Sequence, residues 1–367
     1  MLYFLFFLFF YKSLEKSDVY FTKDVNSSLV TIFRKLNVQL GENVALKVHT
    51  GEPGGEYYLK PDYLQEIYNY TNGTFIESNA AYNGIRNTTE THKKYLKESG
   101  WDNEIRKTII LDENNITIIR DNKEKNQIIK ENIVGEHLKD YKDCIVLTHF
   151  KGNKLAGFGG ALKHLATGFA SQNGKAQIYT SGEIKNWTEL NITENFTVDE
   201  NFTRSMAEAA STVVQYFREN KGKIVFINVM SNISLDCDCV GARARAPKID
   251  DLGILASTDP VALDRACLDL IKKRNNTNHS GEHDLLEQIK NTSGENIINV
   301  AVKIDLGSEQ YNFIDIDENK RTVLGLILFL CIIISSVLIA GILAYCLGKK
   351  GKNSKEKNKL VEKNDEE

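Results

Sequence analysis

Two cysteines that alternate with two aspartates are the most unusual residues of the chain. Asp236, Cys237, Asp238 and Cys239 follow one another directly. Thiolates and carboxylates side by side are ligands for zinc or iron, but two cysteines with one residue between them need a further ligand such as a histidine. The same pair could form a strained local disulfide or act as a redox-active dithiol. The sequence leaves these three alternatives open.

A second group of polar residues surrounds a glycine-rich turn within residues 144–170. An apolar run ends in His149 and Lys151, and Lys163 follows in an Ala/Leu-rich segment. The turn contains three glycines: Gly157, Gly159 and Gly160. Backbone N–H groups there, with a helix N-terminus, would hold a phosphate or carboxylate. The glycines would serve tight strand–helix packing equally well. Their spacing fits neither the Walker A loop nor the dinucleotide fingerprint.

The elements that must position these residues follow from hydrophobic patterning. Apolar runs predict strands at residues 43–49, 74–77, 108–111, 116–120, 144–148, 224–229 and 252–256. Periodic segments with start and stop signals predict helices at residues 61–70, 90–99, 204–220 and 261–273. Strands that alternate with helices predict an α/β fold, with a mainly parallel sheet covered by helices on both faces.

Polar residues recur where these predicted strands end. His49, His149, residues 236–239 and residues 257–259 each follow an apolar strand. Ligands of α/β folds bind at the carboxyl ends of strands, so we expect the four groups to share one edge. The catalytic candidates are His149, Lys151, Lys163 and Glu52, and the glycine turn is the candidate cofactor loop. The metal candidates are Cys237, Cys239, His49 and Asp236, with His149 as an alternative to His49.

Other residues of these types have more ordinary interpretations. Cys144 and Cys267 lie within an apolar strand and helix and are expected in the core. Asp259 precedes a helix start, which favours capping over catalysis. No Ser/His/Asp or Cys/His triad spacing is evident. The chain has 367 residues with a formal net charge of -3, so its charge does not predict nucleic-acid binding.

Both ends of the chain carry membrane-related signals. Residues 1–16 begin with an apolar run too short to span a bilayer and predict a signal peptide. Residues 322–347 contain no charge and are long enough to span, and the lysine-rich tail 348–367 predicts a cytoplasmic C-terminus. We therefore expect a single-pass type I membrane protein with residues 17–317 as a lumenal or extracellular domain.

Asn-x-Ser/Thr sites agree with this orientation, because they all precede the predicted span. We expect glycosylation at five of them: Asn69, Asn87, Asn115, Asn191 and Asn195.

Seven ordered blocks resemble one known family. They include KVHTGEPGGEYYLKPDY, SNAAYNGIRNTTETH, DCIVLTHFKGNKLAGFGGALKHLATGFAS, IVFINVMSNISLDCDC and DLGILASTDPVALDRACLDLI, and extend from about Val44 to Arg274. The chain resembles the domain-of-unknown-function family 362, often labelled uncharacterised Fe–S centre proteins. The resemblance implies an α/β fold and a site around its motif residues. These are His49, His149, Lys151, Lys163, Cys237 and Cys239.

Two departures from the family qualify that label. Many members carry a ferredoxin-type insert with CxxCxxCxxxCP motifs, whereas residues 183–200 here contain no cysteine. We therefore do not expect a [4Fe–4S] cluster. Most members also resemble soluble proteins, whereas this chain carries the two membrane signals.

Two functions are consistent with these residues. The first is a metal-assisted or redox enzyme, with iron or zinc, that acts on a small anionic substrate held by Lys151, Lys163 and the glycine amides. The second is a non-catalytic surface binding or adhesion module on the same fold.

Overall fold

A twisted sheet forms the centre of the first of two units, Met1–Asp315 and Ile316–Glu367. The computed structural model describes residues 16–121, 127–191, 199–275 and 280–318, together with Ile333, Ser335 and Ile339. The main sheet has eight strands in the order β12-β1-β11-β10-β7-β2-β3-β4. Their bounds are β1 Ser17–Thr22, β2 Val44–Lys47, β3 Thr74–Glu77, β4 Thr108–Ile110, β7 Asp143–His149, β10 Ile224–Met230, β11 Gly253–Ser257 and β12 Tyr311–Asp315.

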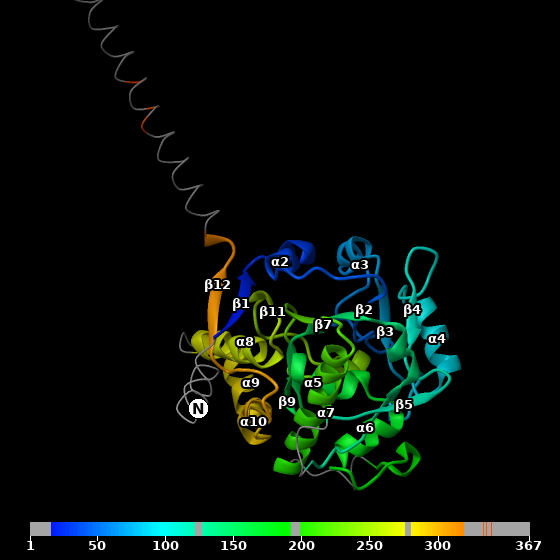
Figure 1. Cartoon of the computed structure of the whole chain (residues 1–367). Coiled ribbons are helices and arrows are strands. Elements are labelled where there is room, and N and C mark those ends of the chain that lie inside the picture. Colours follow the sequence, from blue (N-terminus) through cyan, green and yellow to red (C-terminus); the bar gives the residue numbers. More distant parts are fainter. Residues whose placement is uncertain are drawn as a thin grey trace, which may run out of the picture. The chain divides into compact units, whose positions relative to one another are not determined.

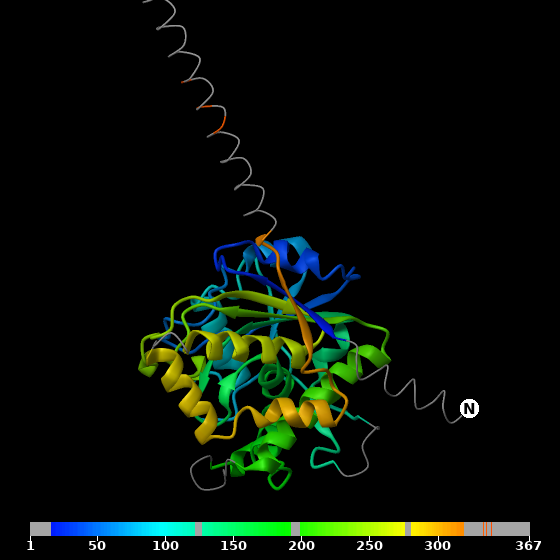
Figure 2. The same ribbon diagram turned by 90° about the vertical axis from the view of Figure 1, so that its left-hand side faces the viewer.

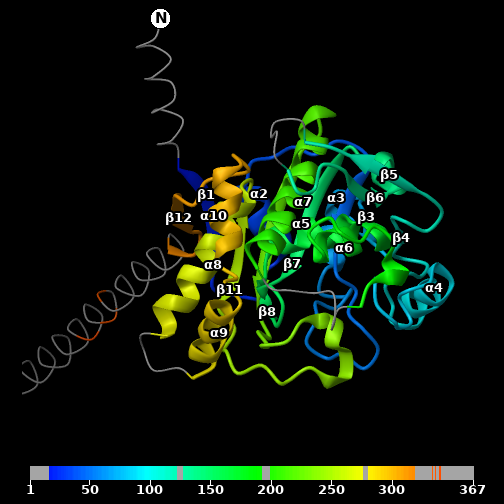
Figure 3. The same ribbon diagram turned by 90° about the horizontal axis from the view of Figure 1, so that it is seen from below.

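Helices cover both faces of this sheet, as expected. The helices are α2 Leu29–Lys35, α3 Gln65–Thr71, α4 Thr89–Glu98, α5 Ala161–Phe169, α6 Gln172–Tyr179, α7 Glu200–Glu219, α8 Pro260–Asn275, α9 Ser280–Asn291 and α10 Asn296–Lys303. Figure 1 shows α2 and α3 on one face and α5, α7 and α8 on the other. The yellow and orange helices in Figure 2 confirm that α8 and α10 lie on the face opposite the blue helices. Figure 3 shows α4 at the end of the sheet away from α10.

Two short hairpins complete the strands. β5 (Ile116–Ile119) pairs with β6 (Asn132–Gly135), and β8 (Lys151–Asn153) pairs with β9 (Gly157–Gly159). The second hairpin is the glycine-rich turn of the sequence. At its tip, Asn153 Oδ1 accepts hydrogen bonds from the N–H groups of Leu155 and Ala156. Gly157 adopts a φ of 79°, which favours glycine.

The predicted strands all form, with ends within two residues of expectation. The predicted helix at residues 61–70 begins later, at Gln65, because Tyr63 and Leu64 donate to carbonyls three residues back and form a turn instead. The helix predicted from residue 204 begins earlier, at Glu200, because the Asp199 side chain accepts from the N–H of Phe202. Patterning missed β1 and β12.

The direction of β11 shows that one of the four groups expected at the shared edge of the sheet does not lie there. Most neighbouring strands are parallel, but β11 runs antiparallel to both β1 and β10. The segment 231–252 connects the end of β10 to the start of β11. It therefore lies at the carboxyl edge of the parallel strands. The residues after β11 lie at the opposite edge, so Asp259 does not share the edge of His49 and His149. Its carboxylate accepts from the N–H groups of Val261 and Ala262, which makes it a helix cap.

The signal peptide and the span lie almost entirely outside the described residues. Among the residues that the structure describes, no helix is long and apolar enough to cross a membrane.

A buried carboxylate joins three elements of the core. Asp264 of α8 accepts from the N–H of Ala161 at 2.7 Å, from the N–H of Leu162 at 2.9 Å and from Asn228 Nδ2 at 2.8 Å. It therefore satisfies the N-terminus of α5 and fixes that helix against β10 and α8.

Replacing Asp264 with alanine is expected to lower the free energy of unfolding by about 3–5 kcal/mol, because three buried donors lose their acceptor. Urea unfolding of the purified chain, followed by tryptophan fluorescence, measures this change. The control is Asp250→Ala, at an exposed ion pair with Arg274, where a change below about 1 kcal/mol is expected. If the two substitutions lowered the free energy of unfolding equally, the role of Asp264 as the buried acceptor that fixes α5 would be contradicted.

Candidate functional site

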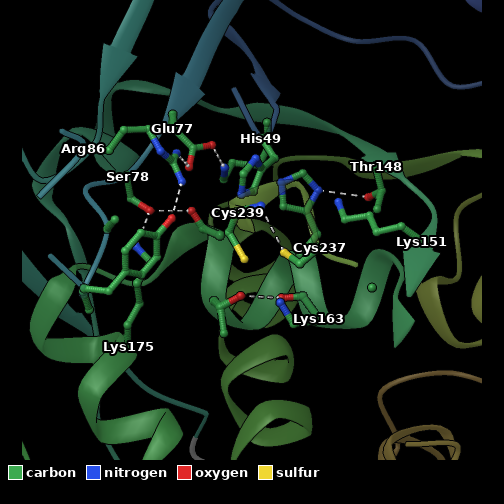
Figure 4. Close-up of a pocket in the computed structure, with 18 of the residues that line it drawn as sticks. His49, Glu77, Ser78, Arg86, Thr148, Lys151, Lys163, Lys175, Cys237 and Cys239 are labelled. Atoms are coloured by element: carbon green, nitrogen blue, oxygen red, sulfur yellow. Dashed lines mark hydrogen bonds and ion pairs between the residues drawn. The ribbon is translucent and has the colours of Figure 1, made fainter. Parts of the chain in front are cut away.

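A pocket with a cavity volume of about 80 Å³ opens at the carboxyl edge of the parallel strands. Strands β2, β3 and β7, helices α5 and α6, and the segment after β10 all contribute to its wall (Figure 4). The charged, imidazole and thiol side chains that line it are Lys47, His49, Glu77, Arg86, Lys151, Lys163, His164, Lys175, Cys237 and Cys239. The wall therefore combines five cationic side chains, one carboxylate, two imidazoles and two thiols.

Three of the cations form ion pairs within the protein, and two of them, Lys47 and Arg86, share the carboxylate of Glu77. Lys47 Nζ lies 2.6 Å from Glu77 Oε2, and Arg86 Nη1 lies 3.3 Å from Glu77 Oε1. Arg86 Nε lies 2.7 Å from Glu52 Oε1, and Tyr82 also donates to that oxygen. Burial lowers the pKa of Lys47, although Glu77 opposes this shift. These contacts fix the back wall of the pocket.

Two lysines of this wall, one from α5 and one from α6, have no ion-pair partner among the described residues. Lys175 Nζ donates to Ser78 Oγ, Asn79 O and Ala170 O at 2.6–2.7 Å, which uses all its hydrogens on neutral acceptors. Burial lowers its pKa to about 8. In the described part of the chain, no carboxylate lies within ion-pair distance of Lys163. Burial works to lower the pKa of Lys163, but Tyr179 and the two cysteine sulfurs outweigh it and the pKa is raised.

Both imidazoles of the wall are neutral. Burial and the nearby Arg86 hold the pKa of His49 well below its usual value, and His49 Nδ1 accepts from the N–H of Gly51 at 3.0 Å. Its hydrogen is consequently on Nε2, which makes His49 a donor. His164 Nδ1 lies 3.0 Å from Thr148 Oγ1, and burial lowers the pKa of this ring as well. His164 Nε2 is buried and has no hydrogen-bond partner among the described residues.

The two thiols act as a pair that shares one proton. Figure 4 shows Cys237 and Cys239 side by side above Lys163, and the N–H of Cys239 donates to Cys237 Sγ at 3.4 Å. The hydrogen bond from the Cys239 thiol, with Lys163 and Lys151, lowers the pKa of Cys237 to about 5. The same hydrogen bond and burial hold the pKa of Cys239 well above its usual value. At neutral pH, Cys237 is therefore the thiolate and Cys239 the thiol.

A buried ion cluster holds the segment that carries these cysteines. Asp238 Oδ1 lies 2.8 Å from His149 Nδ1, and Asp238 Oδ2 lies 2.8 Å from Lys151 Nζ. His149 Nε2 lies 2.7 Å from the carbonyl oxygen of Ser231. Both ring nitrogens of His149 therefore lie next to acceptor oxygens. His149 and Lys151 hold the pKa of Asp238 well below its usual value, against the effect of burial.

The predicted site residues thus divide into two groups. His49, Lys151, Lys163, Cys237 and Cys239 line the pocket, as do Gly159 and Gly160. His149 and Glu52 lie behind the wall, where they position Asp238 and Arg86. Asp236 accepts from the N–H and guanidinium of Arg245 and is not among the residues that line the pocket.

The glycine turn is built for packing. A side-chain carbon on Gly157 would come within 3.1 Å of Thr292, Ile289 and Gly294, and one on Gly160 would lie 2.3 Å from Asp264 Oδ1. The N-terminus of α5, expected to bind a ligand anion, is occupied by the Asp264 carboxylate instead. The protein's own carboxylate therefore occupies the amides of Ala161 and Leu162, while Gly159 and Gly160 line the pocket.

The expected iron or zinc ligands do not form a set. Within the described residues, no three or more His, Cys, Asp or Glu side chains are grouped to hold a metal ion. Asp236 is bound to Arg245, His149 uses both ring nitrogens, and His49 Nε2 carries a hydrogen. The residues present therefore do not fit a protein-held metal centre.

Sequence reasoning missed four charged residues of the wall: Lys47, Glu77, Arg86 and Lys175. Lys47 had a detectable signal, since a lysine in the apolar run VALKV falls inside a fully buried strand. A buried lysine requires a partner, which here is Glu77 at the end of the adjacent strand. Arg86 lies in a polar loop and Lys175 in a short helix, where neither stands out.

The fold and site define an α/β protein with a cation-lined, thiol-bearing pocket at its strand ends. The family model described as domain of unknown function (DUF362) matches residues 44–269, and the chain belongs to this family. This confirms the resemblance drawn from the sequence blocks. No curated protein matches.

Two solved structures are similar to this chain at low identity. A protein from Thermotoga maritima is 10% identical with a TM-score of 0.40, over 76% of this chain and 58% of that one. The lactate racemase apoprotein from Thermoanaerobacterium thermosaccharolyticum is 15% identical with a TM-score of 0.33, over 58% of this chain and 50% of that one. The chain thus spans about half the length of either structure, and likenesses of this degree say nothing about its activity.

Alkylation of Cys237 tests the thiolate assignment. We expect its rate with iodoacetamide to be level between pH 6 and 8 and to fall as the pH drops through about 5, because the thiolate is then protonated. Mass spectrometry of peptides identifies the modified cysteine. Lys163→Ala is expected to move the midpoint upward, because it removes a neighbouring positive charge, whereas Lys94→Ala at an exposed position on α4 should leave it in place. A wild-type midpoint near the ordinary thiol value would refute the assignment.

Proposed function

We propose that this pocket binds a small anion and acts on it through the Cys237 thiolate. The observation that carries the proposal is the convergence of the Cys237–Cys239 pair with five cationic side chains on one small pocket. The proposal keeps the small anionic substrate and the redox-capable pair expected from the sequence, and replaces the metal with the thiolate.

The charge of the pocket supports an anionic ligand. Its wall has five cationic side chains, and three carboxylates pair with them: Glu77 in the wall and Glu52 and Asp238 behind it. Against the five cations stand these three carboxylates and the Cys237 thiolate, so one positive charge remains in excess on Lys163 and Lys175, whose amino groups contact no carboxylate in the described residues. Charges in a protein interior are weakly screened, so a ligand with negative charge would be held strongly there.

The donors available to such a ligand support the same conclusion. Lys163 Nζ, His49 Nε2 and His164 Nε2 belong to side chains of the wall, and His164 Nε2 is a buried nitrogen that lacks a partner among the described residues. A buried polar atom without a partner costs about 1–3 kcal/mol, so a ligand that bonds to it recovers this energy. Oxygen atoms of an oxyanion or carboxylate are suitable partners for Lys163 Nζ and His49 Nε2, and for His164 Nε2 in the tautomer that places the ring hydrogen there.

The volume limits the ligand to a small molecule. A cavity of roughly 150 Å³ holds benzene, and the cavity here is about 80 Å³. The proposed ligand is therefore smaller than benzene, as a tetrahedral oxyanion or a two-carbon carboxylate is. Nucleotides and most cofactors are larger.

Anion binding and anion-directed alkylation test this proposal together. Sulfate, phosphate and acetate are titrated into the purified chain by calorimetry, with Lys163→Met and Lys94→Met as a matched pair. We expect Lys163→Met to weaken binding at least tenfold and Lys94→Met to leave it unchanged. We also expect the rate ratio of anionic iodoacetate to neutral iodoacetamide at Cys237 to exceed the ratio in the unfolded chain, because the pocket concentrates anions.

Three outcomes bear on the proposal. Binding that is equal in both lysine variants would contradict it. Binding without any preference for iodoacetate would favour the non-catalytic binding module expected as the alternative. Anion binding and alkylation are both repeated in EDTA, and the iron and zinc content of the preparation is measured by elemental analysis. If both are lost when iron or zinc is removed, the metal hypothesis is restored.

We further propose that this pocket faces the lumen or the extracellular space on a membrane-anchored glycoprotein. The apolar segment 322–347 and the lysine-rich tail support the anchor. Asn69, Asn115 and Asn191 are exposed and Asn87 is partly exposed, which leaves them accessible to glycosylation.

Enzymatic removal of N-glycans from the full chain, made in cells with a secretory pathway, tests this topology. We expect a loss of mass that Asn69→Gln and Asn115→Gln each reduce by one glycan. Protease added to intact microsomes should remove the tail and spare residues 17–317. If removal of N-glycans caused no loss of mass and the protease digested the whole chain, the proposed topology would be contradicted.

A further inference from the structure

Anion binding alone does not require a second thiol, that of Cys239, beside the reactive Cys237. Both sulfurs line the same small pocket, and the N–H of Cys239 contacts Cys237 Sγ. Neither cysteine forms a disulfide in the structure. A second thiol within reach of the first is the arrangement that lets a covalent intermediate on one sulfur be displaced by the other.

We infer that Cys237 and Cys239 form a reducing dithiol that removes the sulfane sulfur from a small sulfur oxyanion of the thiosulfate class. The inference rests on the proposed function, because it identifies the anion of that same pocket and the reaction that the thiolate performs on it.

Geometry restricts where the electrophilic atom of the ligand lies. Lys163 interacts electrostatically with both Cys237 and Cys239, and Figure 4 places it directly below them. A ligand that fits about 80 Å³ must therefore place its negative charge within a bond or two of the atom that the thiolate attacks. A sulfur–sulfur bond next to a sulfonate group satisfies this condition.

The chemistry of the thiolate selects sulfur among such atoms. Thiolates react with divalent sulfur by direct displacement, and the leaving group departs with the bonding electron pair. Sulfite is the leaving group here, and its negative oxygens match Lys163 and the imidazole donors of the wall. His164 supplies a buried nitrogen without a partner among the described residues and His49 an N–H group, so the wall offers hydrogen-bonding nitrogens beside the lysine.

The reaction takes place in two balanced displacements. The Cys237 thiolate attacks the sulfane sulfur, a bond from Sγ to that sulfur forms, the sulfur–sulfur bond of thiosulfate breaks, and sulfite leaves. Cys239 then attacks Cys237 Sγ, the disulfide forms, and the sulfane sulfur leaves as hydrosulfide with the proton that Cys239 gives up. The dithiol is oxidised by two electrons and the sulfane sulfur is reduced by two. An external thiol reductant restores the dithiol.

A single-turnover experiment tests the inference. The reduced full chain is freed of reductant without oxygen and mixed with excess thiosulfate, and sulfite, sulfide and intact mass are measured. We expect about one sulfite and one sulfide per chain, with the loss of two hydrogens from the protein. Sulfate, which has no sulfane sulfur, serves as the control that binds without reaction.

Variants separate the two steps. Cys239→Ser is expected to release sulfite without sulfide and to retain one added sulfur on Cys237, which is removed by dithiothreitol. Cys237→Ser is expected to release neither product. Lys163→Met should slow sulfite release at least tenfold, while Lys94→Met should match the wild-type chain.

The outcomes that overturn this inference are distinct from those that overturn the proposed function. If sulfate and thiosulfate bind but no sulfite is released, the inference fails and the anion pocket stands. If Cys239→Ser releases sulfide as the wild type does, the role of Cys239 is refuted. If no anion binds at all, the proposed function itself fails.

Discussion

The contacts of Asp238 with His149 and Lys151 are the interaction on which the site depends. The segment that carries Cys237 and Cys239 lies between β10 and β11 and has little regular structure of its own. Asp238 lies between the two cysteines and is held by the His149 ring at the end of β7 and by Lys151, the first residue of β8. Both thiols are consequently fixed against the carboxyl edge of the sheet. An unpaired carboxylate could not remain buried there.

The same principle organises the rest of the pocket wall. Each buried cation of the back wall is matched by a carboxylate from a neighbouring element, as in the Lys47–Glu77 pair between β2 and β3. These ion pairs offset the free-energy cost of burying the charges, and their geometry restricts the conformations of the side chains. Lys163 has no carboxylate within ion-pair distance in the described residues, and the negative group beside it is the Cys237 thiolate. The back wall is thus held by carboxylates, whereas the charge of Lys163 faces the reactive sulfur.

In residues 144–170, tertiary packing gives a recognisable sequence pattern a different role from the one that it predicts. A glycine turn before a helix predicts an anion at the helix N-terminus, and an anion is indeed present: it is the carboxylate of Asp264. Gly160 is required because a side chain there would collide with this carboxylate. The turn thus fastens α5 to α8, and Lys163, one residue beyond the amide of Leu162, faces the pocket instead. The ligand-binding role moves from the backbone of the turn to the side chains that follow it.

Local sequence determined the strands and the residues at their ends. Apolar runs of the right length specify buried strands, and polar residues that follow them mark the carboxyl edge, so the sequence alone was enough to place His49, Lys151 and Cys237 in one site. Membership of the family also follows from the sequence blocks alone. Only the tertiary structure decided the direction of β11, which removed Asp259 from that edge and turned residues 231–252 back into the site. Strand direction depends on pairing between distant segments, which hydrophobic periodicity does not encode. The partners of Lys47, Arg86 and Asp264 were likewise decided by tertiary packing, because ion pairs and caps between separate elements depend on distance in space.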